Sequence, residues 1–162
     1  MVIKIVCLIV LFLLIIYVGY GILKYYRKRQ QFYEDLIDFI NCLNTEIAFL
    51  KTDLISLIGN NCHKYHNDMN DLLIRYLDNL KNNDTNFDAK MQVLSREENM
   101  EVNNFLNSLG KTNLEEQKTC IAHYKCRFSE KKQKSDQEKE KNGVTYFKLC
   151  IVVAIGVCIV LI

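Results

Sequence analysis

Two long apolar segments, one at each end of the chain, constrain the fold more than any other feature of the sequence. The first runs from Ile5 to Leu23 without a charged residue. As a helix it would be about 28 Å long, enough to cross the hydrocarbon core of a membrane. The second runs from Val144 to Ile162 and contains one charge, Lys148, whose side chain can reach the lipid headgroups. The sequence therefore predicts a two-pass protein of the cell membrane, with transmembrane helices at residues 1–23 and 143–162.

Basic residues flank the inner ends of both predicted spans. Those that we assign to membrane anchoring are Lys24, Arg27, Lys28, Arg29 and Lys148. Lys and Arg close to a span favour the cytoplasmic side and attract lipid headgroups, so we predict that the middle of the chain is cytoplasmic. A cleaved signal peptide is the rival interpretation of the first segment. Against this interpretation, the apolar run is longer than the apolar region of a usual signal peptide, and no Ala-x-Ala-like cleavage site follows it.

Residues 24–142 remain for a single domain between the spans, a length that suits one hydrophobic core. The chain has 21 basic and 19 acidic residues and a formal net charge of +2, so it lacks the strongly basic character of nucleic-acid-binding domains. Its seven cysteines do not indicate disulfides, because three fall in the spans and the others face a reducing compartment. The absence of proline favours an all-α domain over a turn-rich β domain.

Apolar residues at spacings of three and four predict the helices of this domain. One stripe covers residues 32–50 and can continue directly from the first span, and a second covers residues 69–80. Between them, Thr52 or Asp53 can cap a short segment, and Gly59-Asn60-Asn61 is expected to form a loop. Phe87, Met91 and Leu94 suggest one further short helix.

Residues typical of helix ends organise the second half of the domain. Ser95 and Glu98 have the spacing of a capping box, and the helix that they begin should stop at Gly110, which suits a left-handed C′ position. Thr112 or Asn113 can then cap a last, long helix. Residues 129–142 are charged and lack apolar side chains. We predict that they form a solvated helix leading into the second span, with a disordered linker as the alternative.

Two groups of Cys and His raise the alternative of a membrane-tethered metal or redox sensor. The side chains concerned are Cys62, His66, Cys120, His123 and Cys126. The last three recur every third residue on a predicted helix, which can direct two ligands at one ion. The paired units of familiar zinc sites are absent from the sequence, however, as are phosphate-binding loops and a recognisable catalytic arrangement. We therefore expect no enzymatic activity, no cofactor and no metal.

Two short segments lie at predicted helix ends. Residues 46–54 read Glu-Ile-Ala-Phe-Leu-Lys-Thr-Asp-Leu, and residues 109–117 read Leu-Gly-Lys-Thr-Asn-Leu-Glu-Glu-Gln. They resemble the Glu-Ile-x-aromatic-x-x-Thr-Pro-Leu and Leu-Gly-x-x-Asp-x-x-x-Gln motifs of the stage III sporulation protein AB family of endospore-forming bacteria. The residues that we assign to these structural motifs are Glu46, Ile47, Phe49, Thr52, Leu54, Leu109, Gly110, Glu116 and Gln117. Asp53 replaces the family's Pro and Asn113 its Asp, and both substitutes can still cap a helix or form a turn.

The resemblance implies a non-enzymatic membrane subunit of the channel-like complex between mother cell and forespore. By similarity, its cytoplasmic helical domain looks like those of the inner-membrane platform proteins of type II secretion and type IV pilus machines. Such a platform would couple a cytoplasmic secretion-type ATPase, the family's AA partner, to other stage III sporulation membrane subunits. The domain would then lie on the mother-cell side, in contact with membrane lipids and without nucleic acid. Whether the chain also forms a homo-oligomer stays open.

Overall fold

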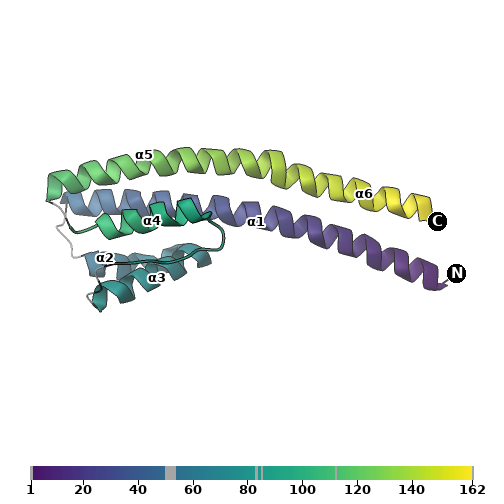
Figure 1. Cartoon of the computed structure of the whole chain (residues 1–162), viewed down its shortest axis with the longest axis horizontal. Helices are drawn as coiled ribbons and strands as arrows, with labels where there is room; N and C mark the ends of the chain where they lie inside the picture. Colours follow the sequence, from purple (N-terminus) through teal and green to yellow (C-terminus); the bar gives the residue numbers. More distant parts are fainter. Residues whose placement is uncertain (1, 50–53, 83, 85, 112, 162) are drawn as a thin grey trace. The chain divides into compact units, whose positions relative to one another are not determined.

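The computed structural model describes residues 2–49, 54–82, 84, 86–111 and 113–161, and within these residues the regular elements are all helical (Figure 1). The α-helices are α1 (Val2–Phe49), α2 (Leu54–Asn61), α3 (Asn67–Lys81), α4 (Arg96–Ser108), α5 (Leu114–Glu138) and α6 (Thr145–Leu161). A 3₁₀ turn, Cys62–Lys64, follows α2, and a π-helical turn, Lys139–Val144, joins α5 to α6. The predicted all-α class is confirmed for these residues.

The chain forms two compact units, which we call the membrane unit and the head. The membrane unit comprises Met1–Gln30 and Lys134–Ile162, and the head comprises Gln31–Gln133. Two helical stretches, Val6–Glu46 and Leu114–Ile159, are long and apolar enough to cross a membrane, which confirms that the protein has two membrane-length helices. The domain borders expected from hydropathy, after residues 23 and 142, stay a prediction.

Small residues bring α1 close to α6 and to the π-helical turn in the membrane unit. A Cβ atom added to Gly19 would lie 2.9 Å from Cβ of Cys150, and one added to Gly143 would lie 3.3 Å from Cβ of Tyr26. Ala154 of α6 is fully buried. Close approach through small side chains is a common way of packing helices in a membrane, where apolar side chains gain nothing from leaving water. At the end of this unit, the Arg29 guanidinium donates to the Glu138 carboxylate at 2.6 Å.

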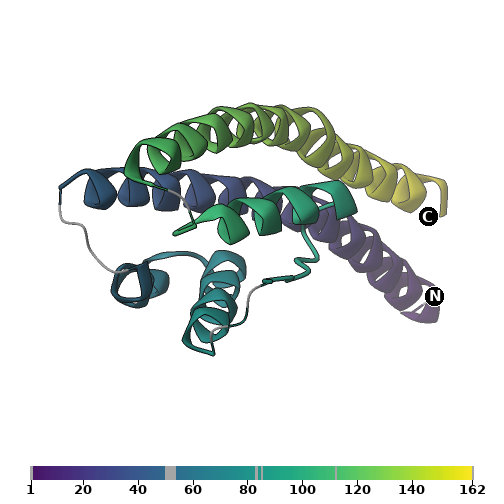
Figure 2. The same ribbon diagram turned by 60° about the vertical axis from the view of Figure 1, so that its left-hand side comes forward.

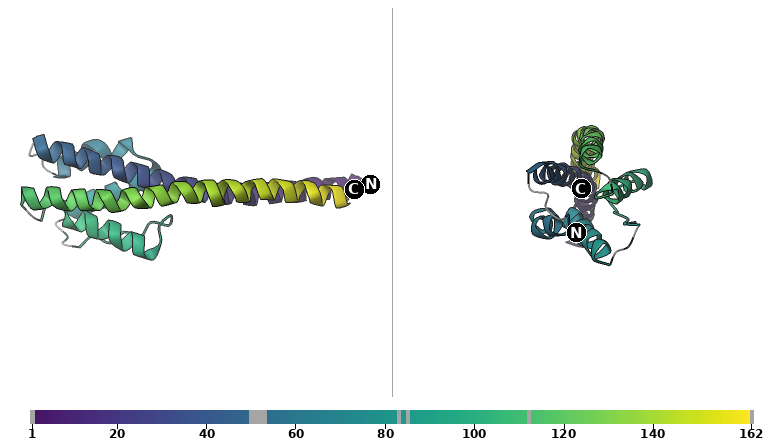
Figure 3. Two further views of the ribbon diagram at one scale, coloured as in Figure 1. Left: turned by 90° about the horizontal axis from the view of Figure 1, so that it is seen from above. Right: turned by 90° about the vertical axis from the view of Figure 1, so that its left-hand side faces the viewer.

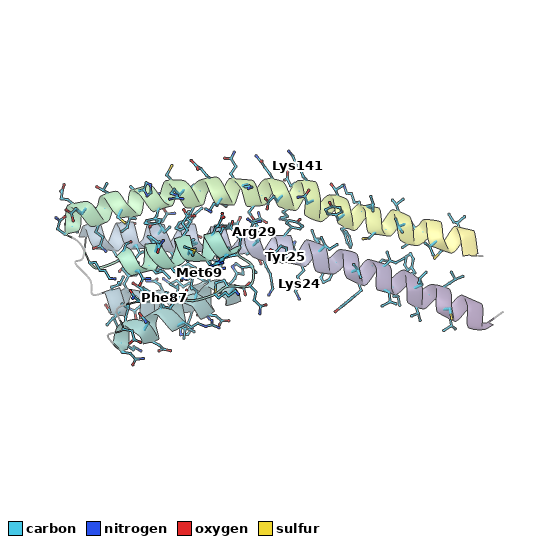
Figure 4. All side chains as sticks on the ribbon, in the orientation of Figure 1. Lys24, Tyr25, Arg29, Met69, Phe87 and Lys141 are labelled. Carbon is cyan, nitrogen blue, oxygen red and sulfur yellow. The ribbon has the colours of Figure 1, made fainter. Side chains whose placement is uncertain are left out.

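The core of the head is built from the apolar stripes of its helices. Seen end on, α1, α5, α4 and the pair formed by α2 and α3 surround this core (Figure 3). The largest fully buried side chains are Tyr33, Phe32, Phe39, Phe105, Phe128, Leu36, Ile40, Leu43, Leu57, Ile58, Met69 and Leu72. Two residues of this core, Met69 of α3 and Phe87, are labelled in Figure 4. The predicted stripes at 32–50 and 69–80 are thus confirmed as far as Leu43 and Leu80, while the side chains of Ile47 and Leu50 lie outside the described residues.

Three of the predicted helix-end signals are confirmed. Ser95 and Glu98 form a complete capping box at the start of α4. Gly110 follows α4 with a φ of +76°, a backbone conformation that favours glycine. The Asn113 side chain caps α5 by accepting the Glu116 N–H at 2.9 Å. Thr52, Asp53 and Thr112, the alternative caps, lie outside the described residues.

The loop expected at Gly59-Asn60-Asn61 is wrong, because these residues form the last turn of α2. Asn61 is buried, and its side-chain amide donates to the Leu57 carbonyl at 2.9 Å while accepting from the Lys64 ammonium at 2.6 Å. Burial of the neighbouring Leu57 and Ile58 stabilises the helix more than the Gly and Asn propensities weaken it. The chain passes directly from α2 into the 3₁₀ turn.

The helix expected at Phe87, Met91 and Leu94 is also wrong, because the described residues between α3 and α4 form no helix. Figure 2 shows this segment running from the end of α3 to the start of α4. In contrast, the helix predicted for residues 129–142 is confirmed in preference to a disordered linker. It comprises the end of α5, to Glu138, and most of the π-helical turn.

Candidate functional site

An asparagine ladder on α4 holds the segment before it in an extended conformation. Asn99, Asn103 and Asn107 are four residues apart and therefore lie on one face of the helix. Each side-chain amide accepts the backbone N–H of one segment residue and donates to the carbonyl oxygen of the same residue. The pairs are Asn107 with Phe87 (both 2.8 Å), Asn103 with Ala89 (3.2 and 3.1 Å) and Asn99 with Met91 (2.7 and 3.1 Å).

This ladder explains why residues 87–91 form no helix although their apolar spacing suggests one. The side chains of Phe87, Ala89 and Met91 are buried while those of Asp88 and Lys90 are exposed, which is the alternation of a β-strand. The strand-like segment therefore contributes every second side chain to the core. The missed signal was the spacing of the three asparagines combined with an apolar residue at every second position from Phe87 to Met91.

Leu54 and Gly110, one described residue from each of the two segments that resemble family motifs, lie close together in the head. Leu54, the first residue of α2, lies with its Cδ2 atom 3.8 Å from the position of a Cβ atom at Gly110. Leu109, which precedes Gly110 in the chain, is buried at 5% exposure. At the end of α1, Glu46 accepts a weak hydrogen bond from the Cys42 thiol at 3.8 Å, and burial raises the pKa of that thiol.

The remaining motif residues have local roles or lie outside the described part of the chain. The Glu116 and Gln117 backbone N–H groups donate to Asn113, to its side chain and its carbonyl oxygen respectively, both at 2.9 Å. These contacts begin α5. Nothing is described for Thr52 or for the side chains of Ile47 and Phe49. The described motif residues thus lie at helix ends, and their assignment as structural motif residues stays a prediction.

A buried carboxylate on α1 binds the residue that precedes α3. Asp35, at 6% exposure, accepts the His66 backbone N–H at 2.8 Å and lies 2.9 Å from Nδ1 of the same residue. The hydrogen bond and charge of Asp35 raise the pKa of the exposed His66 ring above its ordinary value. Beside His66 in sequence, Tyr65 packs edge-on against Phe39, and burial raises its pKa to about 12. Asp35 therefore fixes the start of α3 against α1.

The residues considered as metal ligands are not gathered into one site among the described residues. There, no group of three or more His, Cys, Asp or Glu side chains is placed to hold an ion. His66 is engaged by Asp35, while Cys120 lies 3.4 Å from the Ser108 hydroxyl. His123 and Cys126 are exposed on α5. The side chain of Cys62 lies outside the described residues.

The basic residues assigned to membrane anchoring belong to the membrane unit. Lys24, Arg27 and Lys28 are exposed on α1, and Lys148 is exposed in the first turn of α6. Arg29 instead binds Glu138 of α5, and its side chain is only 17% exposed. Four of the five predicted anchor residues thus present their charges at the surface, whereas the fifth joins the two chain segments of this unit.

The family model for stage III sporulation protein AB matches residues 4–162, essentially the whole chain. The chain belongs to the stage III sporulation protein AB family. Membership supports a role in sporulation, and it confirms the resemblance seen in residues 46–54 and 109–117. Comparisons with curated proteins and with solved structures gave no match.

The two positions where this member of the stage III sporulation protein AB family departs from the motifs can be compared with the structure. Asn113 stands where the motif has Asp, and its side-chain oxygen accepts the Glu116 N–H as an Asp carboxylate would. The cap of α5 is therefore retained by the substitution. Asp53, which stands where the motif has Pro, lies outside the described residues.

Proposed function

We propose that this member of the stage III sporulation protein AB family is a non-enzymatic scaffold, which holds a secretion-type ATPase and neighbouring membrane subunits at the membrane during sporulation. The observation that supports it most is the position of the head in the chain. Its residues, 31–133, include the inner parts of two membrane-length helices, Val6–Glu46 and Leu114–Ile159, whose outer parts precede and follow the head in the chain. A domain tethered on both sides is well suited to resisting or transmitting force between a cytoplasmic partner and membrane components.

The construction of the head agrees with such a role. The first candidate span and the first helix of the head are parts of one helix, Val2–Phe49, without a connecting loop. Within the head, Glu101 of α4 forms ion pairs with Arg127 at 2.7 Å and with Lys131 at 2.8 Å, so that charged contacts add to the apolar core in joining α4 to α5. In this proposal the head is cytoplasmic, on the mother-cell side, and acts like the platform domains of type II secretion and type IV pilus machines.

Photo-crosslinking in sporulating cells tests the scaffold. A photoreactive amino acid is placed at Met100 or His123, which are exposed on α4 and α5 of the head. We expect at least one of these positions to yield an adduct with the secretion-type ATPase. Val152, which is 69% exposed on α6 of the membrane unit, is the matched control and should crosslink to membrane subunits or lipid only. Failure of every exposed head position to capture the ATPase would contradict the proposal.

The orientation is tested separately by labelling one cysteine. Cys126 is exposed in the head, so a variant that keeps Cys126 and has serine at the other six cysteine positions reports the location of the head. A membrane-impermeant maleimide should label this variant only after the cells are permeabilised. Labelling of intact cells would place the head outside the cytoplasm and would contradict contact with a cytoplasmic ATPase.

A further inference from the structure

The segment bound by the asparagine ladder has one edge that no backbone group of the described residues occupies. In an extended chain, the N–H and C=O groups of successive residues point to opposite edges. Those of Phe87, Ala89 and Met91 point to α4 and bind the ladder. Those of Asp88 and Lys90 therefore point to the other edge, where the described residues offer them no hydrogen-bond partner. At the start of this edge the Asn79 amide reaches the Asn86 carbonyl at 3.4 Å.

The ladder keeps this edge in the conformation that a second strand requires. Six hydrogen bonds fix residues 87, 89 and 91, and their side chains are packed into the core. The backbone groups of Asp88 and Lys90 thus both face the open edge and alternate along the chain with those of the ladder-bound residues, as in an edge strand. Pre-ordering of this kind lowers the entropic cost of binding. An extended peptide is the ligand whose own backbone groups match such an edge, as in other cases of strand addition.

The charges around the edge indicate the side chains that a bound strand should carry. Lys90 is exposed on the extended segment and forms no ion pair with a described residue. Asp88 is exposed as well, but its carboxylate accepts a hydrogen bond from the Asn103 amide at 2.8 Å. This bond directs the carboxylate toward α4 and away from the open edge. An acidic side chain opposite Lys90 would therefore be favoured, since opposite charges stabilise cross-strand pairs.

We propose that the open edge at Asp88 and Lys90 is a docking site for an extended acidic segment of a partner protein, which pairs with it as an added β-strand. A charged residue in the middle of an exposed edge discourages indiscriminate pairing, so Lys90 also restricts the site to acidic strands. A second copy of this chain is a poorer occupant, because it would bring another Lys90 while its Asp88 is turned toward α4. The inference concerns how a partner docks. It is valid whether or not that partner is an ATPase.

Binding of a designed peptide to the full chain in detergent micelles tests the site. The probe is a fluorescein-labelled peptide with blocked ends and the sequence Ser-Glu-Val-Glu-Val-Glu-Val-Ser, and empty micelles give the background. Lys90→Pro removes the N–H that faces the open edge but leaves both neighbouring ladder residues intact. Lys90→Ala removes the same charge and keeps the N–H. We expect Lys90→Pro to bind about tenfold more weakly than Lys90→Ala, since an edge hydrogen bond is lost and the ring obstructs the added strand.

Two modified peptides provide a measurement on the unmodified protein, which keeps the test valid even where Lys90→Pro fails to fold. One carries N-methyl groups on the glutamates and the other on the valines, so that opposite edges of the strand are blocked. Binding should survive in one peptide and be lost in the other. Equal binding of both, or equal affinities of Lys90→Pro and Lys90→Ala, would overturn the proposal. So would absence of peptide binding, or a dimer of the full chain that Lys90→Pro dissociates, which would identify a second copy as the occupant.

Discussion

Asn103 and Ala89, fourteen residues apart, bind each other through two hydrogen bonds. The Ala89 N–H donates to Oδ1 of Asn103 at 3.2 Å, and Nδ2 of Asn103 donates to the Ala89 carbonyl at 3.1 Å. Both residues are buried, at 7% and 6% exposure, so water has little access to replace these bonds. A side-chain amide thus does for Ala89 what a neighbouring β-strand would do, and an all-helical head gains a strand-like segment.

Loss of this amide should destabilise the head. We expect Asn103→Ala to cost about 1–3 kcal/mol of unfolding free energy, the usual penalty for leaving buried polar groups without partners. Thermal unfolding of the purified full chain in micelles, followed by circular dichroism, measures the change. Asn104→Ala is the matched control, because Asn104 is the next residue of α4 and is exposed. Equal melting temperatures for the two variants would show that the ladder contributes no stability.

Local patterns were sufficient to predict the helices whose apolar stripes form the core. The stripe from Phe32 to Leu43 and that of α3 have the period of a helix, and burial of these side chains follows from the period alone. The Ser95–Glu98 box, Gly110 and the Asn113 cap were predictable for a similar reason. Each depends on the chemistry of residues within one helical turn. The family was predictable because its two motifs are such helix-end segments.

The two wrong predictions, the helix at Phe87 to Leu94 and the loop at Gly59 to Asn61, have a common cause. Both segments are determined by contacts that are distant in sequence or buried. Phe87, Met91 and Leu94 match helical spacing, but their segment is held by asparagines 8 to 20 residues further along the chain. The apolar residue at every second position from Phe87 to Met91 indicates an extended segment only when it is combined with the spacing of these distant asparagines. At the end of α2, Gly59 and Asn60 favour a loop, yet the burial of Leu57 and Ile58 continues the helix. The docking edge at Lys90 was missed for the first reason, since it exists only when the ladder forms.

Two glycine substitutions should change stability in opposite directions. Gly110 has a φ of +76°, so Gly110→Ala places a Cβ atom in a left-handed conformation and should destabilise by about 1–2 kcal/mol. Gly59 is helical and a Cβ atom there meets nothing within 4 Å. Gly59→Ala should therefore stabilise α2 by about 0.5–1 kcal/mol. Melting temperatures of the two variants on either side of the wild-type value would bear this out, and a shift in the same direction would contradict it.

The contact between His66 and Asp35 should make stability depend on pH. The pKa of His66 is raised in the folded protein above its ordinary value of 6.5, so the protonated ring favours folding. This contribution is complete below the unfolded pKa and is lost as the pH rises through the raised folded pKa. It should be small, because the His66 side chain is 62% exposed and water screens the charge.

The His66 dependence is measured as the difference in melting temperature between the wild type and His66→Ala. This difference should be largest near about pH 6 and should shrink as the pH is raised above the folded pKa. The substitution leaves the backbone N–H that also binds Asp35. His63→Ala is the control, since His63 is exposed and has no carboxylate partner among the described residues. A difference that stays constant with pH, or grows as the pH rises, would show that the ring does not bind Asp35 as a cation.

The close approach of Gly19 to Cys150 predicts a specific crosslink inside the membrane unit. A Cβ atom on Gly19 would lie 2.9 Å from Cβ of Cys150, and a small shift would reach the separation of about 3.5–4.5 Å that a disulfide requires. We expect Gly19→Cys to form an intrachain disulfide on mild oxidation, detected as a faster-migrating band on a non-reducing gel. Gly21→Cys should form none, because a Cβ atom at Gly21 meets nothing within 4 Å. Replacing Cys150 by Ser in Gly19→Cys should abolish the band, and its persistence would show that α1 and α6 do not pack through Gly19.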